Sequence, residues 1–199
     1  MRPMLGTVFT YFAFGTRPAI ETDINKPSEF KNWTSIHGRS LLDFGAGHFN
    51  EVNILRSVGI DADGFEPFRL APGTSAIDPC LARETTRDLL AKIAGGKAWD
   101  SIMLATVLNS VPFASDRRHI VRICASLCDA NTTLFSGCSS DTHPRWLDMT
   151  REIVNATNDL TSKFILDYEP GVTIGDIIDS PKAQKYHTTQ EVEKLFGEV

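Results

Sequence analysis

The amino-acid sequence predicts an α/β protein with a doubly wound, mainly parallel sheet and helices on both faces. From residue 40 onward, short apolar runs alternate with stretches whose apolar residues recur at helical spacing. The run at 101–108 is almost continuously apolar, which is typical of a strand covered on both faces. The chain has 199 residues, of which 42% are hydrophobic and 23% charged, so it can bury one core and is not intrinsically disordered.

A strand, a glycine turn and a helix open the regular part of the chain. Residues 40–44 form a short apolar run that the glycine-rich segment 45–47 closes, as expected of a buried strand entering a tight turn. Helical spacing of apolar residues then continues to Gly59, a residue type that commonly ends helices. A second strand is expected over 60–65, because Pro67 cannot donate to a strand ladder.

Strands and helices continue to alternate through the middle of the chain. A short third strand is expected around 74–77. Asp78 followed by proline marks the start of a helix that glycines stop at 95–96. After the central strand, a helix is expected with Asp116 at its start, and a further strand over 132–136.

The C-terminal part is less regular. The expected elements are a helix over 144–159, a strand at 164–166, an irregular excursion over 171–180 and a final helix. That final helix begins with Thr188 and Glu191 at the spacing of a capping box.

Charge and cysteine usage exclude several classes of protein. Lys and Arg number 20 against 25 Asp and Glu, a net charge of -5, which is the wrong sign for holding nucleic acid by phosphate neutralisation alone. Arg117 and Arg118 are expected on an exposed helix face. No apolar run approaches the ~18 residues of a membrane span, and Pro18 to Glu21 offers no signal cleavage site. The four cysteines lack zinc spacing, so we expect reduced thiols, no metal site and a cytoplasmic protein.

One constellation carries the chemistry. Asp43-x-Gly45-x-Gly47 lies at a strand end, and Glu66 ends the next strand. Glycines permit a tight turn and close approach of a ligand, the following helix directs its amide groups into the same crevice, and the second acid can accept from ribose hydroxyls. The pattern predicts a site for a nucleoside-containing cofactor. NAD is disfavoured, because Asn50 stands where the third glycine of the dinucleotide fingerprint belongs.

The segment Leu41-Leu42-Asp43-Phe44-Gly45-Ala46-Gly47-His48-Phe49, followed by Gly64-Phe65-Glu66-Pro67, resembles the first motif of the class I S-adenosylmethionine-dependent methyltransferases. Phe49 departs from it, because many members have a third glycine there. The segment Trp99 to Val111 is similar to the family's fourth-strand region, so the resemblance covers about residues 38–140.

The resemblance implies a role for each matching position. Asp43 would steady the cofactor's amino group, directly or through water, and Glu66 would hold the ribose. Asp78 would meet the adenine edge, with Asp88 as a weaker candidate, although Asp78 is equally suited to capping its helix. Gly45, Ala46 and Gly47 would pack against the methionyl end of the cofactor. Thr106 and Asn109 would line the face where the cofactor meets the methyl acceptor, and His143 would face the substrate.

The same resemblance implies a methyltransferase that uses S-adenosylmethionine and acts on a small molecule or RNA. Acceptors with exocyclic base amines are disfavoured, because Ala105-Thr106-Val107-Leu108 replaces the Asn/Asp-Pro-Pro-aromatic motif of those enzymes. The alternative is a non-catalytic cofactor-binding or scaffold subunit with the same fold.

The domain organisation follows from the same comparison. We expect residues 38–199 to form the Rossmann-like cofactor-binding domain and residues 1–37 an N-terminal extension. In the family, a helix like the final one here precedes an antiparallel finish to the sheet, so the sheet is expected to be incomplete or modified at that end. Either the apolar segment 4–14 adds a strand and covers the substrate side, or a second copy or partner chain covers the exposed edge.

Overall fold

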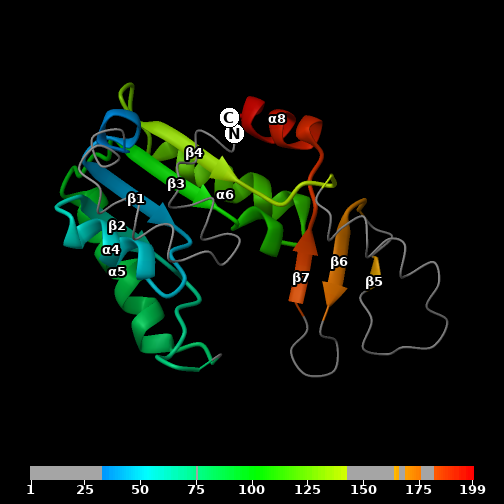
Figure 1. Ribbon diagram of the computed structural model, residues 1–199, viewed down its shortest axis with the longest axis horizontal. Helices are drawn as coiled ribbons and strands as arrows, with labels where there is room; N and C mark the ends of the chain where they lie inside the picture. Colours follow the sequence, from blue (N-terminus) through cyan, green and yellow to red (C-terminus); the bar gives the residue numbers. More distant parts are fainter. Residues whose placement is uncertain (1–32, 75, 143–163, 166–168, 176–181) are drawn as a thin grey trace. The chain divides into compact units, whose positions relative to one another are not determined.

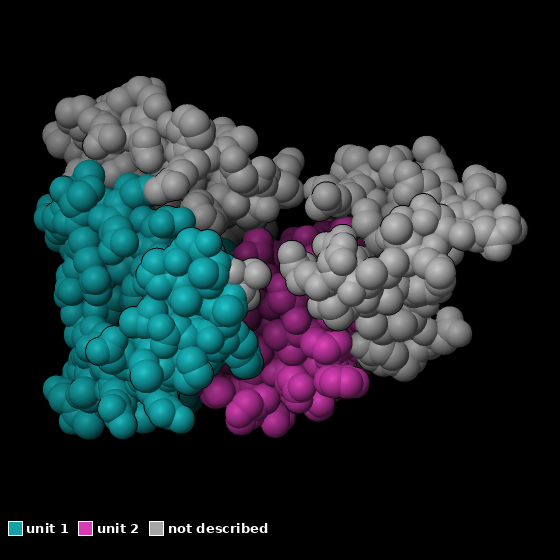
Figure 2. Space-filling model, turned by 90° about the horizontal axis from the view of Figure 1, so that it is seen from below, with its two compact units in different colours: residues 1–105, 124–137 teal, residues 106–123, 138–199 magenta. Residues whose placement is uncertain are grey.

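The computed structural model describes residues 33–74, 76–142, 164–165, 169–175 and 182–199. The chain divides into two compact units, which we describe separately (Figure 2). Unit 1 comprises residues 1–105 and 124–137, and unit 2 comprises residues 106–123 and 138–199. The expected N-terminal strand at 4–14, the helix over 144–159 and His143 lie outside the described residues.

Unit 1 is built on a four-stranded parallel sheet, which confirms the predicted fold class (Figure 1). The strand order is β2-β1-β3-β4. The strands are β1 (Ser40–Phe44), β2 (Asp61–Phe65), β3 (Ser101–Ala105) and β4 (Thr133–Gly137). All three pairings are parallel, so the carboxyl ends of the strands lie at one edge.

Helices cover both faces of this sheet. Helix α4 (Asn50–Ser57) buries Val52 and Leu55 in one core cluster with Leu41, Ala62 and Met103 of the strands. Neighbouring residues of a strand point to opposite faces. Asp63 therefore points away from that cluster, and on its face Lys92 of helix α5 (Pro79–Ala94) approaches the carboxylate to 2.8 Å.

The expected third strand at 74–77 is wrong. Among the described residues of that segment, only an isolated antiparallel bridge pairs Leu70 with Ile77. The turn at Pro72 and Gly73 breaks the run, and Gly73 has a positive φ of 72°. The chain therefore passes from β2 into α5, whose N-cap Asp78 accepts from the Cys80 and Leu81 amides, as predicted.

The Trp99-Asp100 pair has structural roles in unit 1. Trp99 is buried and its Nε1 donates to Asp63 at 2.9 Å. The Asp100 carboxylate accepts from the backbone N–H groups of Arg39 and Ser40 at the start of β1. A Cβ at Gly38 would lie 2.2 Å from the Asp100 Cβ, so glycine is required there. These contacts join β1, β2 and β3 at the edge opposite their carboxyl ends.

Unit 2 contains a three-stranded antiparallel sheet in the order β5-β6-β7. Its strands are β5 (Phe164–Ile165), β6 (Val172–Gly175) and β7 (Lys182–Lys185), so the expected strand at 164–166 is confirmed at its first two residues. Strand β6 falls where only an irregular excursion was expected. Helix α8 (Thr189–Gly197) begins with the predicted capping box between Thr188 and Glu191.

Two further elements follow β3. The expected strand over 101–108 is shorter, because η1 (Leu108–Ser110) is a 3-10 turn. Helix α6 (Ala114–Ser126) starts two residues before the expected Asp116. None of the helices in the described part of the chain is long and apolar enough to cross a membrane.

Arg117 is buried, which corrects the expectation of an exposed face. It is 4% exposed, forms an ion pair with Glu169 and donates to the carbonyls of Val111 and Pro112. Lys185 lies in the same network and is 1% exposed. Its Nζ is 2.8 Å from a Glu191 carboxylate oxygen and 3.4 Å from Glu169. Buried charges of this kind persist only when paired, so unit 2 is held together by an ionic core.

Candidate functional site

The carboxyl end of β1 is the point where the strand order of the parallel sheet reverses. From β1 the chain continues through α4 to β2 on one side, and then through α5 to β3 on the other. In open α/β sheets, ligands bind beyond the carboxyl ends of the strands at this switch point. Asp43 lies there, paired in register with Gly64 of β2 and Met103 of β3.

The glycine turn after β1 is held by backbone hydrogen bonds. The N–H groups of Gly45 and Ala46 both donate to the carbonyl of Phe65, at 2.7 and 3.0 Å. Gly45 and Gly47 have positive φ angles of 97° and 51°, which explains the requirement for glycine. A Cβ built at Gly47 would meet no atom of the described residues within 4 Å, its two chain neighbours apart. Gly45 and Ala46 thus shape the turn, whereas Gly47 has open space beside it.

Glu66 closes the turn from β2. One of its carboxylate oxygens accepts from the Gly47 N–H at 2.9 Å, and the other accepts from the Phe68 N–H at 2.9 Å. The acid predicted to hold a ribose is therefore fixed against the glycine turn by two backbone donors. Each carboxylate oxygen has a second lone pair, so hydroxyl groups of a ligand can still donate to it.

Asp43 is 5% exposed, and no hydrogen-bond partner of its carboxylate is found among the described residues. Burial raises the pKa of Asp43 well above its ordinary value, and the nearby carboxylates of Glu51 and Glu66 raise this pKa further. Glu51 is 3% exposed and lies in the first turn of α4. A cation placed here would relieve the repulsion among three acids.

Arg69 and Phe49 complete the turn. Phe49 is the N-cap of α4 and has a φ of 62°, which is strained for any residue except glycine. Its ring fills the space over Gly64, because a Cβ on Gly64 would lie 2.6 Å from a Phe49 ring carbon. The Arg69 guanidinium stacks on this ring at 3.8 Å from the centroid and donates to the Gly47 carbonyl at 2.9 Å.

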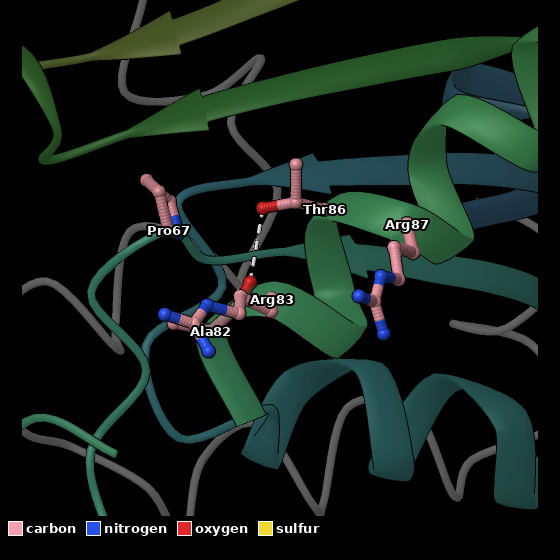
Figure 3. A pocket seen from close by; sticks show the side chains of 5 residues that line it. All are labelled: Pro67, Ala82, Arg83, Thr86 and Arg87. Carbon is pink, nitrogen blue, oxygen red and sulfur yellow. Dashed lines mark hydrogen bonds between the residues drawn. The ribbon is translucent and has the colours of Figure 1, made fainter. Parts of the chain in front are cut away.

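A shallow hollow of about 310 Å³ lies on unit 1 beside the end of β2 (Figure 3). Its lining residues are Pro67, Ala82, Arg83, Thr86 and Arg87. Pro67 directly follows Glu66, but none of the sequence-predicted site residues lines the hollow. Asp78, the adenine-edge candidate, accepts both helix-capping hydrogen bonds with the same carboxylate oxygen, and its other oxygen takes no part in the cap.

Thr106 and Asn109 belong to unit 2. Thr106 has a φ of 60°, an uncommon conformation that is enriched at functional sites. Asn109 is buried, accepts from the Ser139 N–H at 2.9 Å and donates to the Ser139 hydroxyl at 3.2 Å. Its amide therefore joins the segment after β3 to the segment after β4. His143 lies outside the described residues.

Sequence reasoning missed several polar residues of both units. In unit 1, these are Glu51 and Arg69. In unit 2, His187 is 3% exposed, and burial together with Lys185 and Arg117 lowers its pKa to about 4. A weak signal existed for Glu51, because acids are favoured in the first turn of a helix.

No protein-family model matches the chain, and no curated protein matches its sequence. The structure is similar to the crystal structure of DesVI from Streptomyces venezuelae, with a TM-score of 0.50 and 12% sequence identity over 96% of this chain and 87% of DesVI. The fold is class I methyltransferase-like. At this identity the match establishes the fold alone.

Proposed function

We propose that this chain is an S-adenosylmethionine-dependent methyltransferase that acts on a small-molecule or RNA acceptor. The observation that carries the proposal is the buried Asp43 carboxylate beside the open face of Gly47, with Glu66 bonded to the same glycine. A methyltransferase-like fold supports the assignment.

The residues fit this cofactor. Asp43, whose charge is disfavoured by burial and by Glu51, would receive the positively charged amino group of the methionyl end. Glu66 would accept from the ribose hydroxyls, and the open side of Gly47 would let the ligand approach the backbone. When bound, S-adenosylmethionine supplies an electrophilic methyl group on a sulfonium ion.

Methyl transfer makes modest chemical demands on the protein. It is an in-line displacement, so the chain has to align the acceptor with the methyl carbon and exclude water. A general base is required only when the acceptor begins protonated. We assign no base here, because His143 lies outside the described residues and Asn109 cannot accept a proton at neutral pH.

The proposed cellular location is the cytoplasm. All four cysteines are free. Burial raises the pKa of Cys124 to about 12 and that of Cys138 to about 11, so these two thiols are unreactive. Free thiols support a reducing, cytoplasmic environment.

Calorimetry with S-adenosylhomocysteine and with NAD tests the proposal. We expect binding of S-adenosylhomocysteine in the micromolar range and none of NAD. Glu66→Ala should weaken binding by roughly 1 to 3 kcal/mol, the cost of removing hydrogen bonds to a charged acceptor. It should also lower stability, because the Gly47 and Phe68 N–H groups lose their acceptor. NAD binding without S-adenosylhomocysteine binding would overturn the proposal.

A second candidate is a non-catalytic cofactor-binding subunit. Asn109 favours it, because the nitrogen and the oxygen of its side-chain amide are both engaged by Ser139. The two candidates differ in turnover. Acceptor-dependent conversion of S-adenosylmethionine to S-adenosylhomocysteine would establish the enzyme, whereas tight binding without turnover across small-molecule and RNA acceptors would favour the non-catalytic subunit.

A further inference from the structure

We propose that Arg69 is a positioning residue for ribose recognition, and that Phe49 is the platform on which it acts. This inference rests on the proposed function, because it concerns how Glu66 is presented to a nucleoside. It assigns a role to the residue that replaces the third glycine of the motif.

Gly47 is held through both of its flanking peptide groups. Its N–H donates to Glu66 at 2.9 Å, and its carbonyl accepts from Arg69 Nη1 at 2.9 Å. The φ of Gly47 is 51°, and among the described residues, its two chain neighbours apart, no atom lies within 4 Å of a Cβ built there. The two hydrogen bonds restrain the backbone of Gly47 on either side of its Cα, and the orientation of its N–H group in turn positions the Glu66 carboxylate.

Phe49 explains why Arg69 stays in place. The guanidinium lies 3.8 Å from the ring centroid, a distance at which the cation is attracted by the face of the ring. The ring itself is fixed against β2, because Gly64 leaves room for it and for no additional atom. A glycine at position 49 would relieve the backbone strain of the 62° φ angle but would remove this support.

Gly64, Phe49, Arg69, Gly47 and Glu66 form a series of contacts that starts in β2 and returns to the residue after it; we call this series the clamp. Gly64 seats the Phe49 ring, Phe49 carries Arg69, and Arg69 holds the Gly47 carbonyl. Gly47 in turn donates to Glu66, one residue beyond the end of the same strand. Preorganisation of this kind raises affinity by reducing the ordering that binding requires.

The first measurement needs no ligand. Amide hydrogen exchange of Gly47 reports its bond to Glu66 directly. We expect faster Gly47 exchange in Arg69→Ala than in the parent protein, with unchanged exchange in the β3 core. The matched control is Arg122→Ala, which removes an exposed arginine of α6. An unchanged amide exchange rate of Gly47 in Arg69→Ala would contradict the proposed role of Arg69.

The second measurement is a double-mutant cycle with S-adenosylhomocysteine as the probe. Arg69→Ala should weaken binding about tenfold, a size usual for residues in one hydrogen-bond network. In the Glu66→Ala background the same change should have almost no effect, because Arg69 acts through Glu66. Additive losses would mean a general structural role and would contradict the proposal. Arg69→Lys should recover only part of the affinity, since an ammonium lacks the planar stacking of guanidinium.

A further variant guards against misfolding. If Arg69→Ala fails to fold, Phe49→Leu keeps an apolar side chain against Gly64 while removing the aromatic face. It should weaken S-adenosylhomocysteine binding and accelerate Gly47 exchange in the same direction. A parent protein with a protected Gly47 amide but no affinity for S-adenosylhomocysteine would refute the proposed function. Affinity that depends on Glu66 but not on Arg69 would refute only the clamp.

Discussion

Asp43 lies where its surroundings disfavour the charged form of its carboxylate. Its carboxylate is buried beside two other acids, and its folded-state pKa is raised above the ordinary value of 3.8. A raised folded-state pKa means that the native state holds the proton at pH values where the unfolded chain has released it. The contribution of Asp43 to stability is therefore full below pH 3.8 and is lost as the pH rises through the folded-state pKa.

Asp43→Asn should consequently stabilise the ligand-free protein at neutral pH. We expect a gain on the order of 1 kcal/mol in the free energy of unfolding, because an amide neither buries a charge nor has to take up a proton on folding. The gain should shrink as the pH falls towards 3.8. Denaturant unfolding between pH 4 and 8 measures it.

The same variant should lose affinity for S-adenosylhomocysteine, because a neutral amide cannot pair with the ligand's amino group. If the stability difference between Asp43→Asn and the parent does not change with pH, the Asp43 carboxylate either stays protonated between pH 4 and 8 or has its charge balanced by a neighbouring group. Retained affinity would remove Asp43 from the site.

At the scale of elements, helix α5 tests whether Asp78 has one role or two. Asp78→Ala removes acceptors for the Cys80 and Leu81 amides and should lower stability by about 1 kcal/mol, the usual cost of losing an N-cap. Asp78→Ser retains a capping oxygen and should restore most of that stability. Thermal unfolding and S-adenosylhomocysteine titration of both variants separate the roles.

The ligand result decides the assignment. If Asp78 also meets the adenine edge, Asp78→Ser should be stable yet bind S-adenosylhomocysteine more weakly. Parent-like affinity in Asp78→Ser would leave Asp78 as a helix cap alone. The two roles are compatible, because capping engages one carboxylate oxygen and leaves the other.

At the scale of the whole molecule, cofactor binding should be visible as stability. A ligand that binds only the native state stabilises it by about 2.7 kcal/mol at a hundredfold excess over Kd. For a protein of 199 residues, we expect S-adenosylhomocysteine to raise Tm by about 5 to 10 °C at that excess. NAD at the same concentration should leave Tm unchanged, and an equal shift with both ligands would indicate nonspecific stabilisation.

The sequence by itself determined the parts of this protein that depend on local patterns. A few neighbouring residues are enough to recognise the strand Ser40–Phe44, its glycine turn, the Asp78 cap and the capping box at Thr188. The two helix caps satisfy their hydrogen bonds locally, so spacing is sufficient to predict them. The strand and its turn are recognisable from local composition, although their hydrogen bonds run to β2, β3 and Phe65. The candidate acids Asp43 and Glu66 follow from the same local pattern.

Only the tertiary structure decided which distant residues meet. Arg69 is paired with Gly47 across 22 positions, and Lys185 with Glu169 across 16, and neither spacing carries a periodic signal. Burial of Glu51 and Arg117 likewise depends on neighbours from other elements. The strand wrongly expected at 74–77 shows the converse, because the described residues of this segment form only an isolated bridge between Leu70 and Ile77 and no strand ladder. Pairing and burial of distant residues arise only when the whole chain folds, so a short stretch of sequence cannot predict them.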